Sequence, residues 1–130
     1  MKLLLDTHIW LWSLLAPNKL KRRVSKALDD DENELWLSPI SVWESLIIFE
    51  RGRVEISGDP TIFLRDALSA SRVIEAPLTQ EVAIQSRSIS LPHRDPADRF
   101  IAATAQVYEL TLVTADSRLV RRTEYSSLSN

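Results

Sequence analysis

The chain has 130 residues, the length of one ordinary domain, and 45% of them are hydrophobic, which is enough to form a buried core. It contains no cysteine, which excludes disulfide bonds and thiolate metal sites, and its net charge of −2 argues against a generic, uniformly basic nucleic-acid binder. No apolar run has the length of a membrane span, and the leucines after Lys2 meet Asp6 too early for a signal peptide. These features predict a single soluble, cytoplasmic domain over residues 1–130.

The predicted elements alternate between short strands and longer helices. Strands are expected where short runs rich in Leu, Val or Ile are bounded by polar residues or proline, and helices where apolar residues recur every three or four positions. In chain order these are strand 2–5, helices 7–16 and 18–30, strand 34–37, helices 38–52 and 59–71, strand 72–76, helices 79–90 and 95–109, strand 110–115 and a short helix 117–122.

Capping signals support most of these helices. Ser38, Asp59 and Asp95 each precede a proline, which is typical of a helix N-terminus, and Gly52 is typical of a helix end. The caps expected for the other helices are Thr7, Asn18 and Thr79. Strands that alternate with helices favour right-handed crossovers and a parallel sheet covered on both faces. The expected fold is therefore a three-layer α/β/α domain, although the pattern does not give the strand order.

Four carboxylates occupy positions that suit a functional site. In such a sheet, ligands bind beyond the carboxyl ends of the strands. Asp6 directly follows the first strand and Asp116 follows the last predicted strand. Glu44 lies on the apolar side of helix 38–52, and Asp98 lies in the first turn of helix 95–109 below a face of small apolar residues. All four can therefore meet at one edge of the sheet.

Each acid also has a purely structural interpretation. Asp6 and Asp116 could cap the helices that follow them, Glu44 could pair with an arginine, and Asp98 could stabilise the positive end of its helix. Asp95 is interpreted as a helix cap. His8 is interpreted as a packed or hydrogen-bonded imidazole, and the tryptophans as core or interface anchors. The basic stretches 18–23 and 117–122 are interpreted as solvated surface.

The joint placement of the acids favours metal chemistry. Four clustered carboxylates repel one another and raise each other's pKa values, and a hard cation relieves that repulsion. Mg²⁺ and Mn²⁺ prefer carboxylate and water oxygens, and the chain offers no cysteine and only two histidines for a softer metal. Such an ion polarises a phosphodiester and lowers the pKa of water. The sequence therefore indicates metal-assisted phosphodiester hydrolysis.

Four segments together resemble the PIN domain family, specifically the VapC-type toxins of bacterial toxin–antitoxin pairs. They are LLLDTHIWLW, LSPISVWESLIIFERGRVEI, LPHRDPADRFIAATA and LTLVTADSRL, and the resemblance runs from Met1 to about Arg122. It implies an α/β/α domain with Mg²⁺- or Mn²⁺-dependent endoribonuclease activity. The acidic site that it implies consists of Asp6, Glu44, Asp98 and Asp116, with Thr114 as a nearby polar residue. It leaves open whether Asp95 contributes.

The resemblance also implies partners. VapC-type toxins dimerise and are inhibited by a cognate antitoxin whose tail enters the acidic cleft, commonly with an arginine that competes with the metal. Two alternatives remain: a non-catalytic PIN-like module that binds RNA or an antitoxin, and a phosphatase of the haloacid-dehalogenase type. The phosphatase is disfavoured because that family needs a second aspartate two residues after the first, where this chain has His8.

Overall fold

The computed structural model describes residues 1–92 and 94–130. The strands are β1 (Lys2–Leu5), β2 (Glu34–Leu37), β3 (Ile74–Glu75), β4 (Thr111–Thr114) and β5 (Ser127–Ser129). The helices are α1 (Thr7–Leu15), α2 (Arg22–Asp29), α3 (Pro39–Glu50), α4 (Pro60–Ala70), α5 (Gln80–Ser88) and α6 (Pro96–Val107), with 3₁₀ turns η1 (Pro17–Lys19) and η2 (Ser117–Leu119).

The strands form one sheet in the order β3-β2-β1-β4-β5, and every neighbouring pair is parallel. The central strand β1 lies between β2 and β4, with Leu3 opposite Leu35 on one side and Thr111 on the other. Since the strands are parallel, the residues that follow β1 and β4 emerge at the same edge of the sheet.

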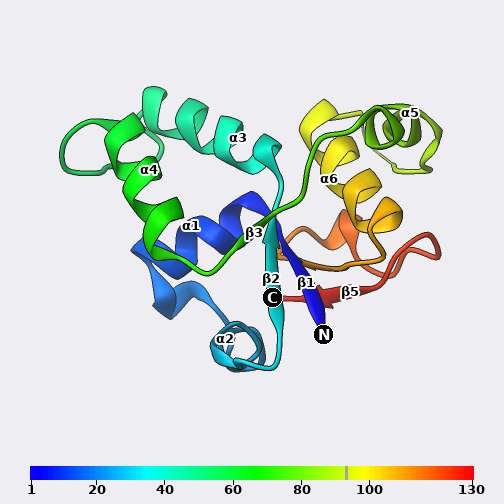
Figure 1. Ribbon diagram of the computed structural model, residues 1–130, viewed down its shortest axis with the longest axis horizontal. Coiled ribbons are helices and arrows are strands. Elements are labelled where there is room, and N and C mark those ends of the chain that lie inside the picture. The colour runs from blue at the N-terminus through cyan, green and yellow to red at the C-terminus, as the bar shows by residue number, and fades with distance from the viewer. Residues whose placement is uncertain (93) are drawn as a thin grey trace.

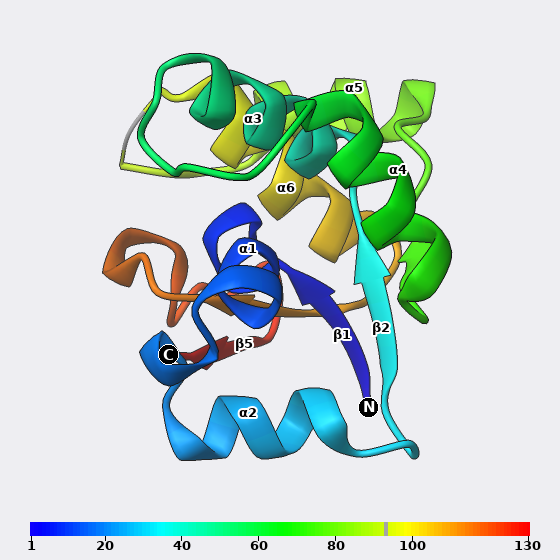
Figure 2. The same cartoon turned by 90° about the vertical axis from the view of Figure 1, so that its left-hand side faces the viewer.

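The sheet separates two apolar cores. Side chains alternate across a strand, so Leu3 and Leu5 enter one core and Leu4 enters the other. Helices α1, α3 and α4 pack on one side of the sheet, and α5 and α6 lie on the other (Figure 1). Figure 2 shows α2 near the start of β1 and β2, at the opposite end of the molecule from α3. The predicted three-layer α/β/α fold is confirmed.

The predicted caps explain where most helices begin. The Ser38 hydroxyl accepts a hydrogen bond from the Ile40 N–H at 3.1 Å, and Asp59, Thr79 and Asp95 cap α4, α5 and α6 in the same way. Gly52 follows α3 with a φ of +66°, the left-handed conformation that glycine adopts at a helix end.

Several details differ from the sequence-based expectation, and one is that the helix predicted at 117–122 is only the 3₁₀ turn Ser117–Leu119. Thr7 is the first residue of α1 and not its cap, because the Asp6 side chain accepts from the Thr7 N–H. The helix predicted at 18–30 begins only at Arg22, because Leu20 is extended and packs against the core. Strand β5 was not predicted, because it has a single apolar residue, Leu128. Within the described residues, no helix has the length and apolar character needed to cross a membrane.

Candidate active site

A cleft of about 570 Å³ lies at the carboxyl edge of the sheet. All four predicted acids line it: Asp6 after β1, Glu44 on α3, Asp98 on α6 and Asp116 after β4. The other lining residues are His8, Trp12, Trp43, Ile47, Ile48, Arg51, Arg53, Asp95, Ala97, Ala115 and Arg118. Four segments that are distant in sequence therefore bring carboxylates to one depression.

Asp6 is held rigidly at the base of this cleft. Only 8% of it is exposed, and its backbone N–H donates to the Val113 carbonyl at 2.9 Å, which fixes it beside β4. Its Oδ1 accepts from the Thr7 N–H at 2.9 Å and its Oδ2 accepts from the Thr114 hydroxyl at 2.6 Å. Burial raises the pKa of the Asp6 carboxyl, and these two hydrogen bonds oppose the rise. Asp6 thus caps α1, as one interpretation proposed, and still lines the cleft.

Thr114 connects the two acids that follow the strands. It is fully buried, and its hydroxyl donates to Asp6 while accepting from the Asp116 N–H at 3.0 Å. One hydroxyl therefore fixes both the orientation of the Asp6 carboxylate and the position of the backbone at Asp116. This is the polar position that the family resemblance implied beside the last acid.

Glu44 is held from the neighbouring helix. The Thr7 hydroxyl donates to Glu44 Oε1 at 2.6 Å and also contacts the Ser41 hydroxyl at 3.0 Å. Burial and, to a lesser extent, the charges of the nearby acids together raise the pKa of Glu44 to about 7, against the lowering effect of the Thr7 hydrogen bond. No ion pair involves Glu44 among residues 1–92 and 94–130, so the arginine partner of its alternative, structural interpretation is not found there.

The other two acids, Asp98 and Asp116, line the cleft from α6 and from the segment after β4. Asp98 is in the first turn of α6, and Asp95 caps that helix through the Ala97 N–H at 3.0 Å while also lining the cleft. Asp116 caps η2, as one interpretation proposed, and its two oxygens accept from the Arg118 guanidinium at 3.1 and 2.9 Å. This forked pairing raises the pKa of Arg118.

The donor chemistry of the cleft suits a hard divalent cation. It supplies carboxylate oxygens, and burial together with the charges of the neighbouring acids raises the pKa of Glu44. In the part of the chain that the structure describes, however, no three His, Asp or Glu side chains come close enough to hold a metal as they stand. Glu44 is turned towards Thr7 and Asp116 towards Arg118, so a shared ion requires side-chain rotation.

The aromatic residues have different environments. Trp10 is buried, and Trp36 stacks on Tyr108 with ring centroids 6.2 Å apart, as expected for core anchors. His8 is exposed in the cleft, with its ring 5.9 Å from that of Trp12. Trp43 is 56% exposed and lines the cleft, so it is not a core residue.

Sequence reasoning missed the basic side of the cleft. Arg51, Arg53 and Arg118 all line it, but only Arg118 lies in a stretch singled out for its charge. The hydroxyl network of Thr7 and Ser41 was also missed. The available signals were the position of Thr7 directly after Asp6, and the three-residue spacing of Ser41 and Glu44 on one helix face.

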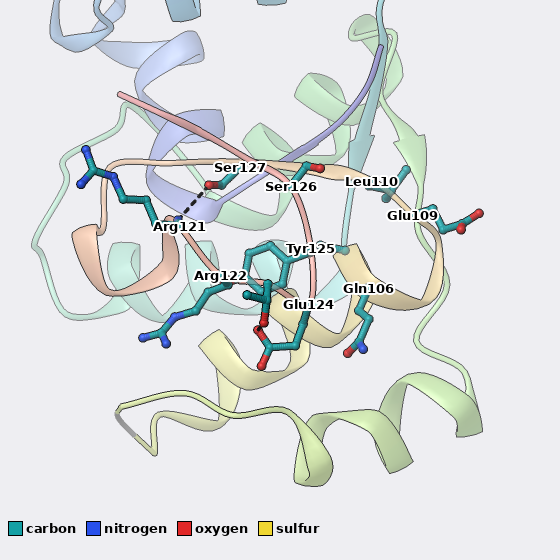
Figure 3. A pocket seen from close by; sticks show the side chains of 11 residues that line it. Gln106, Glu109, Leu110, Arg121, Arg122, Glu124, Tyr125, Ser126 and Ser127 are labelled. Atoms are coloured by element: carbon teal, nitrogen blue, oxygen red, sulfur yellow. Dashed lines mark hydrogen bonds between the residues drawn. The ribbon is translucent and has the colours of Figure 1, made fainter.

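A second cavity, of about 670 Å³, lies between the end of α6 and the segment before β5 (Figure 3). None of the four predicted acids lines it. Its Tyr125 donates to the Leu119 carbonyl at 2.7 Å, and burial raises the pKa of this phenol to about 12. This cavity lacks the convergent acids that give the first cleft its chemistry.

Comparisons with known proteins agree with this geometry. A family model described as PIN domain matches residues 3–124. Ribonuclease VapC22 of Mycobacterium tuberculosis (strain ATCC 25618 / H37Rv) is 32% identical over 119 residues, which cover 89% of this chain and 88% of that protein.

Solved structures share the fold. A chain in the crystal structure of VapBC2 from Rickettsia felis bound to a DNA fragment from their promoter matches with a TM-score of 0.73 at 18% identity, covering 99% of this chain and 98% of that one. A chain of FitAcB from Neisseria gonorrhoeae matches with a TM-score of 0.66 at 27% identity, covering 96% and 95%. The chain belongs to the PIN domain family.

Proposed function

We propose that this protein is a divalent-metal-dependent endoribonuclease, the toxin of a type II toxin–antitoxin pair, which acts in the cytoplasm. The observation that carries the proposal is the meeting of four carboxylates from four separate segments in one cleft. Membership of the PIN domain family and the similarity to a protein named a ribonuclease support RNA as the substrate.

In this proposal Asp6, Glu44, Asp98 and Asp116 hold Mg²⁺ or Mn²⁺, directly or through water. The bound ion would polarise a phosphodiester oxygen and lower the pKa of water. Thr114 orients Asp6, and Thr7 orients Glu44, through the hydrogen bonds that their hydroxyls donate. Because the chain has no cysteine nucleophile, hydrolysis without a covalent enzyme intermediate is the expected route.

The proposal includes a cognate antitoxin and a homodimer. Several structural relatives are chains of a toxin–antitoxin complex or of a VapBC pair, which supports a protein partner. The fork between Arg118 and Asp116 indicates that a guanidinium fits an acid of this cleft, so an arginine from an antitoxin tail could compete there with the metal.

The direct test is to incubate purified protein with total RNA in Mg²⁺ or Mn²⁺, with a parallel sample in EDTA, and to map the cut ends. Cleavage at discrete positions that EDTA abolishes is the expected result. Intact RNA under all conditions, from folded protein freed of any antitoxin, would instead favour the non-catalytic binding module.

A further inference from the structure

The wall of the cleft beside Glu44 carries an exposed tryptophan that metal binding does not use. Trp43 directly precedes Glu44 and is 56% exposed, although a large aromatic side chain gains most from burial. Among the large apolar side chains that are exposed in residues 1–92 and 94–130, Trp43 is the one that lines the cleft. It therefore presents more of its ring to solvent than Trp12, the other tryptophan that lines the cleft, which is half-buried.

Helix α3 places the Trp43 ring on the same helix face as the positively charged Arg51. Trp43, Ile47 and Arg51 are spaced by four residues, so they share one face of the helix, and all three line the cleft. After the helix, Gly52 reverses the chain with a φ of +66°, and the Arg53 N–H donates to the Ile48 carbonyl at 3.1 Å. This turn brings Arg53 back to the cleft as well.

The two arginines of this turn are available to a ligand. Both are exposed, and neither guanidinium makes a hydrogen bond or ion pair with the described residues, in contrast to Arg118. A guanidinium presents several donors in one plane, which matches the oxygens of a phosphate. The wall therefore runs from an aromatic face to two exposed guanidinium groups.

We propose that Trp43, Arg51 and Arg53 form a subsite for an unpaired nucleotide next to the cleavage position, with the base stacked on the indole and its phosphate bound by the arginines. This inference rests on the proposed ribonuclease function. It assigns single-stranded RNA as the preferred substrate, because the faces of paired bases are stacked inside a duplex and cannot reach the indole.

A protein partner fits this wall less well. The core of a protein interface is a contiguous apolar patch with few charged residues. Here the exposed indole is followed along its helix face by the half-buried Ile47 and then by Arg51, and Arg53 adds a second cation from the turn beyond the helix. Aromatic and cationic groups side by side are the combination that binds single-stranded nucleic acid.

The test measures binding of a labelled, unstructured RNA oligonucleotide and of an RNA duplex in Mg²⁺, on the Asp6→Asn background, which is expected not to cleave. Adding Trp43→Ala should weaken binding of the single strand about 5- to 150-fold and leave duplex binding unchanged. Trp43→Phe should keep most of the affinity. The matched control is Ile62→Ala on α4, which removes a side chain of similar exposure, 60%, outside the cleft.

Arg51→Gln and Arg53→Gln test the phosphate contacts. Each should weaken binding of all single-stranded sequences alike and reduce the slope of log affinity against log salt by about 0.7. An unchanged slope in both variants would overturn the phosphate-binding role.

Three results would overturn the role of Trp43: unchanged single-strand binding by Trp43→Ala, an equal loss on duplex RNA, or a change in oligomeric state by light scattering, which would make Trp43 an interface anchor. These failures are distinguishable from failure of the proposed function. RNA cleavage by the wild type with full binding by Trp43→Ala rejects only the subsite. Trp43-dependent RNA binding without any cleavage rejects only the nuclease.

Discussion

Asp6 and Asp116 follow neighbouring parallel strands and line the same cleft, but they are held in different ways. Asp6 is buried, with its oxygens fixed by the Thr7 N–H and the Thr114 hydroxyl. Asp116 is half-buried and pairs with Arg118, whose side chain is exposed. A buried hydrogen-bonded carboxylate is costly to disturb, whereas an exposed ion pair is weak and easily exchanged.

This difference gives the two acids different expected tasks. Asp6, the inner acid, provides a fixed position for a cation, because the orientation of its carboxylate is set before anything binds. Asp116, the outer acid, can exchange the Arg118 guanidinium for a metal or for another guanidinium at little free-energy cost. The predictions below test this division, from the largest expected effect to the smallest.

Asp6→Asn should abolish most activity. It keeps the shape of the side chain but removes the charge of the fixed ligand, and the amide retains only one of the two acceptor oxygens. Loss of a group that only orients a metal ligand reduces affinity or activity about 10- to 100-fold, so loss of the ligand itself should reduce cleavage at least about 100-fold. Initial rates on a defined RNA give the effect, and circular dichroism confirms the fold. Wild-type activity in a folded variant would remove Asp6 from the site.

Thr114→Val should reduce activity about 10- to 100-fold and also destabilise the protein. It leaves Asp6 Oδ2 without its 2.6 Å donor in a buried position, which costs about 1–3 kcal/mol of unfolding free energy. Urea denaturation and cleavage rates measure the two effects. Thr114→Ser retains the hydroxyl and is the matched control. Equal behaviour of the valine and serine variants would show that the hydroxyl does not position Asp6.

Glu44→Gln should change how stability depends on pH. The pKa of Glu44 rises from 4.5 to about 7 in the folded protein, so between these values the folded state binds more protons than the unfolded state. The free energy of unfolding contributed by Glu44 therefore falls as pH rises from about 4.5 to 7. In EDTA, the variant should gain stability relative to the wild type across this window.

Urea denaturation at several pH values between about 5 and 8 measures this effect. Glu50→Gln, which removes an exposed glutamate from the same helix, is the control. The burial and charge account of Glu44 is wrong if the stability curves of wild type and Glu44→Gln run parallel.

Arg118→Gln should have the smallest effect. Because the arginine is exposed, the melting temperature should not change measurably. Affinity for Mn²⁺ should rise slightly, since Asp116 no longer needs to release a guanidinium. Differential scanning calorimetry with and without Mn²⁺ measures both quantities. A large drop in melting temperature would mean that the outer acid is as firmly held as the inner one.

Much of this arrangement follows from the sequence. The leucines of β1 end at Asp6, and the run before Asp116 forms β4, so parallel pairing alone places both acids at one edge. The caps at Ser38 and Asp95 set the starts of α3 and α6, which carry Glu44 and Asp98. Strand order was not predictable, because crossover patterns constrain the handedness of connections and not the position of each strand.

Other features depend on tertiary contacts that leave no local pattern. Strand β5 pairs with β4 through its backbone, so its sequence carries little apolar signal. The hydrogen bond from Thr114 to Asp6 joins residues that are 108 positions apart. The exposure of Trp43 was unpredictable because the helix around it is apolar on several sides.

Calorimetric titration with Mn²⁺, without RNA, tests most directly whether the four acids form one cation site. The wild type should bind Mn²⁺ saturably, and Asp6→Asn, Glu44→Gln, Asp98→Asn and Asp116→Asn should each weaken that binding, with Asp6→Asn the most severe. Undiminished Mn²⁺ binding in all four folded variants, or none in the wild type, would contradict the shared site.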